Sequence, residues 1–203
     1  KAPHNHGVFV GGIASAVTAE MVISILSILE EIEQFIVDKM LPDTYDIADY
    51  YREYFYNGKG YGNLLTYGSF YGYPELGTLY VNPLTYSNNQ IEPFDPRAIT
   101  LSINSSYFKD EAGTDVPDYN KQGAYSWVKT VTYNGVPFEV GPLARQFLSG
   151  EYTNGISAMD RTIARSLEAK KIVSVIKTLV SVLIPNTFMQ KAYEIPQNAE
   201  GQS

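Results

Sequence analysis

Apolar residues recur at spacings of three and four between residues 18 and 41, which is the pattern of a helix with one apolar stripe. Thr18 can cap such a helix, and Glu20 in the first turn suits the positive end of the helix dipole. Pro42 cannot continue a regular helix, so we expect the helix to end there. Acidic residues interrupt its second half and leave fewer than the roughly 18 apolar residues that a membrane span needs. No transmembrane segment is therefore predicted.

A second long helix is predicted near the other end of the chain, over residues 158–184. Ser157 and Asp160 have the spacing of a capping box, and Pro185 stops the pattern. Only Lys177 carries a charge in the second half of this helix, which is more apolar than a helix half in water should be. Because both long helices carry wide apolar stripes, we expect them to lie against each other in an antiparallel manner.

The residues that follow the first helix predict a further helix and then strands and loops. Residues 43–56 have the pattern of a helix with an Asp cap and with Gly58 as its stop, and they carry a stripe of tyrosines. Glycines then separate short aromatic runs, a pattern typical of short strands and turns. Three prolines make residues 82–96 a predicted loop that ends in a short helix or turn. Residues 110–122 are polar and predict a surface loop.

The strongest local signals lie between residues 125 and 150, which contain the only tryptophan. They predict a strand, a turn at Asn134-Gly135, a second strand and then a helix. An Asn-Gly pair favours a type I′ hairpin turn, because that turn needs positive φ at both central residues. Pro142 can open a helix because the N–H that it lacks would have no partner at that position. We expect this short helix to close at Gly150.

Composition and charge narrow the possible functions. With 203 residues, 44% of them hydrophobic, the chain is long enough for one domain with a buried core. The net charge of −7 argues against nucleic acid as a partner, because phosphate binding needs clustered Lys and Arg. The sequence has no cysteine, which excludes disulfides, thiolate nucleophiles and thiolate metal ligands within the chain.

Four groups of residues resemble segments of one protein family. In chain order they are Lys-Ala-Pro-His at 1–4 with Val-Gly-Gly at 10–12, the block at 125–145, Ser-Ala-Met-Asp-Arg-Thr-Ile-Ala-Arg at 157–165, and Glu-Ile-Pro at 194–196 with Glu-Gly at 200–201. The second group contains Tyr-Ser-Trp-x-Lys, a Tyr-x-Gly turn and Glu-Val-Gly-Pro-Leu-Ala-Arg. In this order, and over nearly the whole chain, the groups resemble the large subunit of nickel–iron hydrogenases.

The resemblance implies that the chain is an internal segment of such a subunit. A complete subunit would oxidise hydrogen reversibly to protons and electrons, with a nickel–iron centre held by two paired-cysteine motifs and with a magnesium ion. Those motifs lie outside the matched region, so we expect this segment to bind no metal cofactor and to be inactive in isolation. The implied partners are an iron–sulfur small subunit and the remaining segments of the large subunit. Localisation stays open between the periplasm, a membrane reached through the partner, and the cytoplasm.

The expected fold is α+β and mainly helical. It combines a bundle of long helices with a tyrosine-rich region of short strands and hairpins. Within the single segment of residues 1–203, we expect a loop and helices at 1–57, short strands and loops at 58–140, helices at 141–184 and a tail at 185–203.

Four residues are candidates for a role near the redox centre. His4 matches the family position that faces the iron–sulfur cluster of the small subunit, so the resemblance places it at that interface. Lys129, Glu139 and Arg145 are charged residues in an apolar block, and buried charges are tolerated only when they are paired. We expect these three to form a salt-bridged network beneath the metal site, or one with a purely structural role. No catalytic residue and no direct metal ligand is assigned.

Alternatives from other classes of protein stay open. The chain could be a non-catalytic structural piece, or a binding module that uses the tyrosine-rich surface of residues 45–86. A binding module predicts exposed rings on a flat face, whereas the hydrogenase interpretation predicts that those rings are buried. A hydrolase built on a Ser-His pair has no motif in this sequence to support it.

Overall fold

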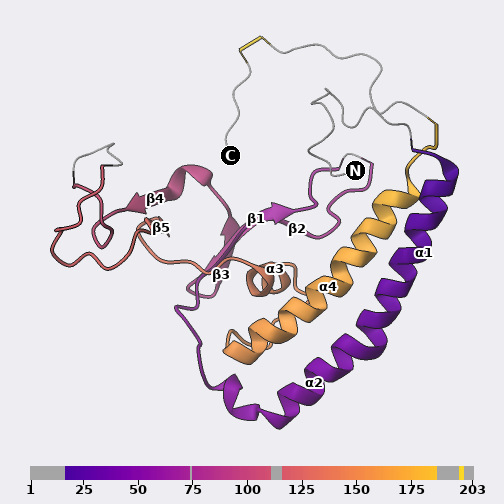
Figure 1. Cartoon of the computed structure of the whole chain (residues 1–203), viewed down its shortest axis with the longest axis horizontal. Helices are drawn as coiled ribbons and strands as arrows, with labels where there is room; N and C mark the ends of the chain where they lie inside the picture. Colours follow the sequence, from indigo (N-terminus) through magenta and orange to yellow (C-terminus); the bar gives the residue numbers. More distant parts are fainter. Residues whose placement is uncertain (1–16, 74, 111–115, 187–196, 199–203) are drawn as a thin grey trace.

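A layer of long helices, a small sheet and a separate strand pair make up the described part of the chain (Figure 1). The computed structural model describes residues 17–73, 75–110, 116–186 and 197–198. Helices dominate and all strand pairs are antiparallel, so the predicted α+β class is confirmed. None of the described helices combines the length and the apolar character that a bilayer crossing requires.

The first helical run is longer than its sequence predicts. It consists of α1 (Ala19–Phe35), a π-helical turn (Ile36–Met40), α2 (Leu41–Tyr50) and a 3-10 turn (Arg52–Phe55). The predicted cap is confirmed, since the Thr18 hydroxyl accepts a hydrogen bond of 3.2 Å from the Met21 N–H. The separate helix predicted at 43–56 is instead the continuation of this run, and only its final turn differs in type.

The prediction that Pro42 ends the first helix is wrong. The Leu41 N–H bonds to the carbonyl of Ile36, five residues back, which widens the turn just before the proline. Pro42 then occupies the first turn of α2, where its missing N–H and its ring cost least. A single π-helical turn thus lets the helical run continue through Pro42, which would break a regular helix.

The second long helix, α4 (Ala158–Ser181), runs antiparallel to α1 (Figure 1). Its predicted capping box is confirmed, with the Ser157 hydroxyl and the Asp160 carboxylate each bonding the other's backbone N–H. At the far end the Asn186 N–H donates to the Val17 carbonyl at 2.7 Å, so the end of one helix lies beside the start of the other. The side chains of Leu29 and Val173 belong to one buried cluster between them. The predicted packing of the two helices is therefore confirmed.

A three-stranded sheet in the order β1-β2-β3 shares a buried cluster with α4. Its strands are β1 (Leu64–Ser69), β2 (Val81–Ser87) and β3 (Gln90–Pro93). The loop predicted at 82–96 is therefore wrong for most of its length, because residues 81–93 form a hairpin. Asn88 and Asn89 both have positive φ and make its two-residue turn. The prolines are tolerated because Pro93 ends an edge strand and Pro83 lies beyond the reach of β3.

A second strand pair joins β4 (Ile99–Ser102) to β5 (Thr130–Tyr133) at the end of the molecule away from α1 (Figure 1). The Asn134-Gly135 turn is confirmed, with φ of 50° and 74° and two hydrogen bonds between Tyr133 and Val136. The strand predicted after the turn is wrong, since β5 pairs with the earlier β4. The reason is that Glu139 instead bonds the backbone beside β1. The short helix predicted from residue 95 is confirmed as a 3-10 turn (Pro96–Ala98).

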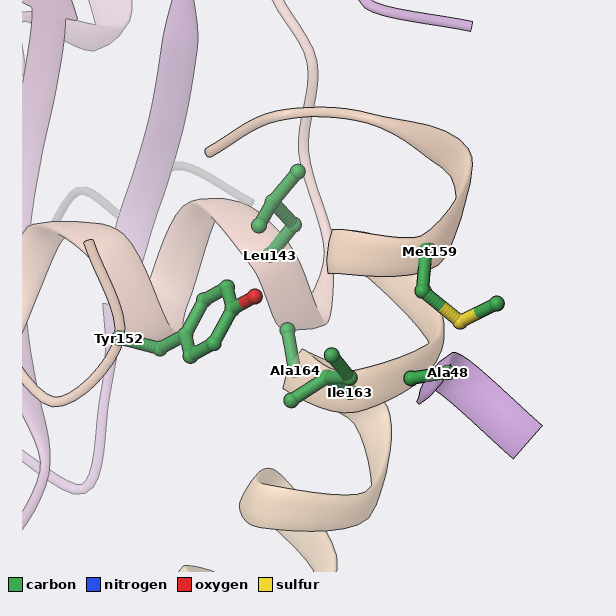
Figure 2. Close-up of a cluster of buried hydrophobic side chains, with 6 residues drawn as sticks. All are labelled: Ala48, Leu143, Tyr152, Met159, Ile163 and Ala164. Carbon is green, nitrogen blue, oxygen red and sulfur yellow. The ribbon is translucent and has the colours of Figure 1, made fainter. Parts of the chain in front are cut away.

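Helix α3 (Pro142–Leu148) lies between the sheet and α4 and joins the two parts of the core. Its predicted bounds are confirmed, and both flanking glycines, Gly141 and Gly150, have the positive φ that other residues avoid. Figure 2 shows where α2, α3 and α4 meet. The buried side chains there are Ala48, Leu143, Tyr152, Met159, Ile163 and Ala164. The start of α3 is thereby held against the first two turns of α4.

Candidate functional site

Glu139 is one of the predicted charged residues, and a backbone bridge fixes its position. Its N–H donates to the Asn63 carbonyl and its carbonyl accepts from the Leu65 N–H, both at 2.8 Å. This attachment to β1 aims the side chain at α4, where both carboxylate oxygens accept from the guanidinium of Arg161 at 2.6 and 2.7 Å. Arg161 also donates to the carbonyl of Gly58. One arginine on α4 therefore holds the entries to both β1 and α3.

Arg145 makes the second ion pair, from the first turn of α3. Its Nε and a terminal nitrogen lie 2.6 and 2.9 Å from the two carboxylate oxygens of Glu168 on α4. Glu168 also accepts from the hydroxyl of Tyr80 at 2.9 Å, and that hydroxyl accepts from the side-chain amide of Gln146 at 2.8 Å. Four side chains from α3, α4 and the sheet region thus form one connected polar cluster, which we call the Arg145 cluster.

Burial controls the electrostatics of the Arg145 cluster. Tyr80 is 7% exposed and Gln146 is fully buried, so neither can exchange its partners for water. Burial and the neighbouring Glu168 carboxylate raise the pKa of the Tyr80 hydroxyl, which keeps it protonated and donating. The hydrogen bonds to Glu168 raise the pKa of the Arg145 guanidinium, so its charge is fixed. The cluster is a rigid arrangement of charge and not a proton donor at neutral pH.

The two ion pairs follow from a spacing on α4 that the sequence carries. Arg161 and Glu168 are seven residues apart, which places them two turns apart on the same face. Their partners Glu139 and Arg145 have the opposite charges and lie at the entry and in the first turns of α3. Sequence reasoning missed Glu168, Tyr80 and Gln146. The i, i+7 pair of opposite charges was the available signal for Glu168, whereas Tyr80 and Gln146 lack any.

Lys129 lies apart from the ion pairs of Glu139 and Arg145. It precedes β5, and its Nζ stands 5.1 Å from the ring centroid of Phe108. That ring belongs to an aromatic group around Trp127, which also contacts Tyr107 and Tyr119. The structure therefore pairs Glu139 and Arg145 with two different residues of α4 and places Lys129 in the region of β4 and β5. His4 lies outside the described residues.

A polar residue in the predicted surface loop at 110–122 is also less exposed than its sequence suggests. The Lys121 side chain is 8% exposed and its Nζ donates to the carbonyls of Ile103 and Phe108, both at 2.9 Å. A third contact of 2.5 Å joins it to Asp110. Lys121 thus ties together the loops around Trp127, a structural role that polarity alone does not reveal.

An open hollow of about 820 Å³ lies between α2 and the loop that precedes α4. Aromatic rings line it, among them Tyr45 and Tyr56, and Asp160 lies at its inner wall. The Asp160 carboxylate accepts from the Tyr152 hydroxyl at 2.6 Å and from the N–H and hydroxyl of Ser157 at 2.7 and 2.5 Å. Burial, and then the bond to Asp160, raise the pKa of Tyr152. This carboxylate is thus committed to the start of α4.

The residues of this chain do not fit a nickel–iron ligand set. Thiolates are the donors that suit such a soft redox site, and the sequence has no cysteine. Across residues 17–73, 75–110, 116–186 and 197–198, no three His, Asp or Glu side chains come together in a way that could hold a metal ion. The Arg145 cluster can orient neighbouring groups by charge and hydrogen bonding, and its arginine also lines a small hollow of about 140 Å³ beside β1.

The tyrosines of the first half are mostly exposed, which corrects the expectation that they are buried. The exposed ones are Tyr45, Tyr50, Tyr51, Tyr54, Tyr56, Tyr61, Tyr67, Tyr71 and Tyr73. Tyr80 is buried, and Tyr86 is half-buried against Phe147 at a ring distance of 4.7 Å. The physical reason is that α2 packs on α4 with one side only, so the rings on its other side face water.

Comparison with known proteins gives consistent matches along the chain. The family described as nickel-dependent hydrogenase matches residues 1–156. The periplasmic [NiFeSe] hydrogenase large subunit of Desulfomicrobium baculatum is 29% identical over 177 residues, which cover 83% of this chain and 34% of that protein. The hydrogenase-2 large chain of Escherichia coli K12 is 29% identical over 175 residues, covering 73% and 31%.

Solved structures show the same likeness in three dimensions. The structure of the H2-activated [NiFeSe]-hydrogenase from Dm. baculatum superposes with a TM-score of 0.83 at 25% identity, covering 97% of this chain and 47% of that one. A [NiFeSe] hydrogenase from D. vulgaris Hildenborough in the as-isolated oxidized state gives a TM-score of 0.79 at 24% identity, with 93% and 45% covered. The chain spans about a third of the length of the curated relatives that it matches.

Proposed function

The chain belongs to the nickel-dependent hydrogenase family, and we propose that it forms an inner section of a large subunit that oxidises hydrogen reversibly to protons and electrons. The observation that carries the proposal is the match over residues 1–156, joined to a fold likeness that extends over 97% of the chain. The proposed contribution of the chain is structural and electrostatic, because it contains no thiolate ligand.

The metal centre of the complete subunit would be held by residues outside this chain. We assign the nickel–iron centre and the magnesium ion to the complete subunit and none of their ligands to residues 1–203. Removing the side chains of the Arg145 cluster would leave such ligands in place. It would change the local charge near α3 and loosen the attachment of α3 to α4. Groups that act in this way tune a metal site without touching it.

Glu139 and Arg145 are the residues that we propose for this positioning role. Their bidentate pairs with Arg161 and Glu168 fix the entry and the first turn of α3 to α4, and 13–30% exposure of these four side chains means that water competes weakly. For Lys129, which lies apart from these pairs, we propose a structural role beside the aromatic group of Trp127. His4, by its family resemblance, would stand at the contact with the small subunit.

The proposed partners are the remaining segments of the large subunit and an iron–sulfur small subunit. In this assignment the partners would cover the exposed tyrosines on α2 and the turns that follow it, because rings with polar tips suit a protein interface. The same exposure favours a second candidate, a non-catalytic binding module. One relative is periplasmic by name, so we propose the periplasm first, with a membrane surface reached through the partner or the cytoplasm as alternatives.

The direct test uses the complete large subunit that carries this sequence, produced together with its small subunit. We expect hydrogen-dependent reduction of a viologen dye, and we expect Glu139→Gln to lower the rate while the nickel and iron contents stay unchanged. Arg97→Gln is the matched control, since its pair with Asp95 is bidentate but solvent-exposed. A fully metallated complex that does not oxidise hydrogen would contradict the proposal.

The isolated 203-residue chain gives an independent check. Because its residues include no thiolate, we expect elemental analysis after purification to find far less than one nickel per chain. A stoichiometric nickel content that survives dialysis would show a ligand set that the sequence does not reveal. The same preparation tests the binding module, which predicts that a glycan or peptide probe shifts the fluorescence of Trp127 or the exposed tyrosines.

A further inference from the structure

The outer face of α1 carries a continuous apolar stripe that remains open to solvent. Its members recur four and three residues apart, and they are Met21, Ile25, Ile28, Ile32 and Phe35. Their exposed fractions lie between 37% and 60%. The side of α1 that faces α4 uses other residues, among them Leu29 at 7% exposure. Figure 1 shows α1 at the outer edge of the molecule with α4 on one side only.

The spacing of the residues in this outer stripe indicates that a second helix can cover it. At about 100° per residue, alternating steps of four and three keep all five side chains within an arc of roughly 80°. This is the seam that one helix presents to another in a coiled coil. From Met21 to Phe35 the stripe is about 21 Å long, or four turns. A second helix of similar length would cover it completely.

The charged residues of α1 indicate which charges the covering helix should carry. All four charged residues of α1 are acidic. Glu30 and Glu33 bind Lys177 of α4 at 2.7 and 2.6 Å, on the side away from the outer stripe. Glu20 and Glu31 form no ion pair with the described residues. Helical periodicity places these two on the edge of the stripe away from Leu29, so this edge is negative.

We propose that the outer stripe of α1 docks one amphipathic helix with a matching apolar seam and with Lys or Arg along its edge. That edge would meet Glu20 and Glu31, as oppositely charged residues beside a seam do. A second copy of α1 would bring two acidic edges together, which disfavours self-pairing through this face. We assign this helix to a further segment of the large subunit, and that assignment rests on the proposed function. The kind of helix that the surface binds does not depend on the proposed function.

The experiment uses a single thiol in the full 203-residue chain, which has no natural cysteine. The Ile28→Cys variant places the thiol in the stripe, and the Gln34→Cys variant places an exposed control on another face of α1. The probe is a peptide of three heptads with Leu at the seam and Lys at its edges. At ten times its Kd, this peptide should slow maleimide modification of the Ile28→Cys thiol about tenfold and leave Gln34→Cys unchanged.

Charge reversal and matched peptides decide whether the surface is specific. A peptide with Glu at the edges and a scrambled Lys peptide should both leave the Ile28→Cys rate unchanged. Adding Glu20→Lys and Glu31→Lys should transfer the protection to the Glu peptide, while helix content by circular dichroism stays the same. Equal protection by all peptides, or protection that rises with chain concentration alone, would overturn the proposal. A bound Lys peptide together with a hydrogenase assay that fails would reject the proposed function and leave this surface intact.

Discussion

The Arg145 guanidinium on α3 donates two hydrogen bonds, of 2.6 and 2.9 Å, to the Glu168 carboxylate on α4. The two residues are 23 positions apart, and their pair closes a loop that contains the Ser157 capping box. With side chains 30% and 13% exposed, the pair is neither a surface salt bridge nor a fully buried one. It therefore couples the position of α3 to that of α4.

Glu168→Gln should lower the free energy of unfolding by about 1–3 kcal/mol. The reason is that Arg145 would keep its charge but lose its carboxylate, and the Tyr80 hydroxyl would lose a charged acceptor. Urea unfolding monitored by circular dichroism measures the loss. Arg97→Gln, which removes an exposed pair of the same geometry, should leave the midpoint unchanged. An unchanged midpoint for Glu168→Gln would mean that the Arg145 cluster contributes no stability.

Leu167→Ala tests the packing of the helix layer. Leu167 lies against two buried clusters, the one drawn in Figure 2 and the one between α1 and α4. Removing its branched end from this position should cost about 2–5 kcal/mol, since the lost contacts and the cavity both count. Ile23→Ala is the control, because Ile23 is 68% exposed and should tolerate truncation. A loss below about 0.5 kcal/mol for Leu167→Ala would place its side chain in solvent.

Stability should fall at alkaline pH because two tyrosines are held protonated. Burial raises the pKa of Tyr80 and of Tyr152 above the ordinary value of about 10, so the unfolded chain releases these protons first. Their contribution is complete below that pH and is lost as the pH rises toward the folded pKa. The loss is up to about 1.4 kcal/mol per pH unit for each tyrosine.

Urea unfolding between pH 8 and pH 11 measures this dependence. Tyr80→Phe combined with Tyr152→Phe should lower the stability at pH 8 and flatten its decline at higher pH. Tyr61→Phe, which changes a ring that is 80% exposed, should keep the decline of the parent chain. A double variant with the parent's slope would show that other groups govern the alkaline transition.

His4→Ala should slow electron transfer from the complete large subunit to the clusters of its small subunit. We expect this because the resemblance at residues 1–4 places His4 at that contact, where it would affect the path without binding the metal centre. Hydrogen oxidation with the natural acceptor should decline while nickel and iron contents stay constant. Unchanged oxidation in the variant would remove His4 from the electron path. Lys1→Ala is a neighbouring control for simple loss of surface charge.

Local signals in the sequence determined where three of the helices begin and where one tight turn lies. Thr18, Ser157 and Pro142 start three helices by satisfying or removing backbone donors, and Asn134-Gly135 makes its turn by accepting positive φ. These effects act within four residues, so the surrounding fold was not needed to predict them. The sequence also predicted the antiparallel packing of α1 on α4, because two helices with wide apolar stripes bury those stripes against each other.

Tertiary structure decided the rest, because those choices depend on partners far away in the chain. The π-helical turn that precedes Pro42, and the pairing of β5 with β4, are not recorded in any local pattern of the sequence. The pairing of Glu139 with Arg161 and of Arg145 with Glu168 required α3 to lie on α4, since charges of either sign could have faced water instead. The exposure of the tyrosines and of the outer stripe of α1 also depends on which distant segments pack against them. An apolar pattern predicts that a face will be covered, and only the contacts in three dimensions show whether the chain covers it itself.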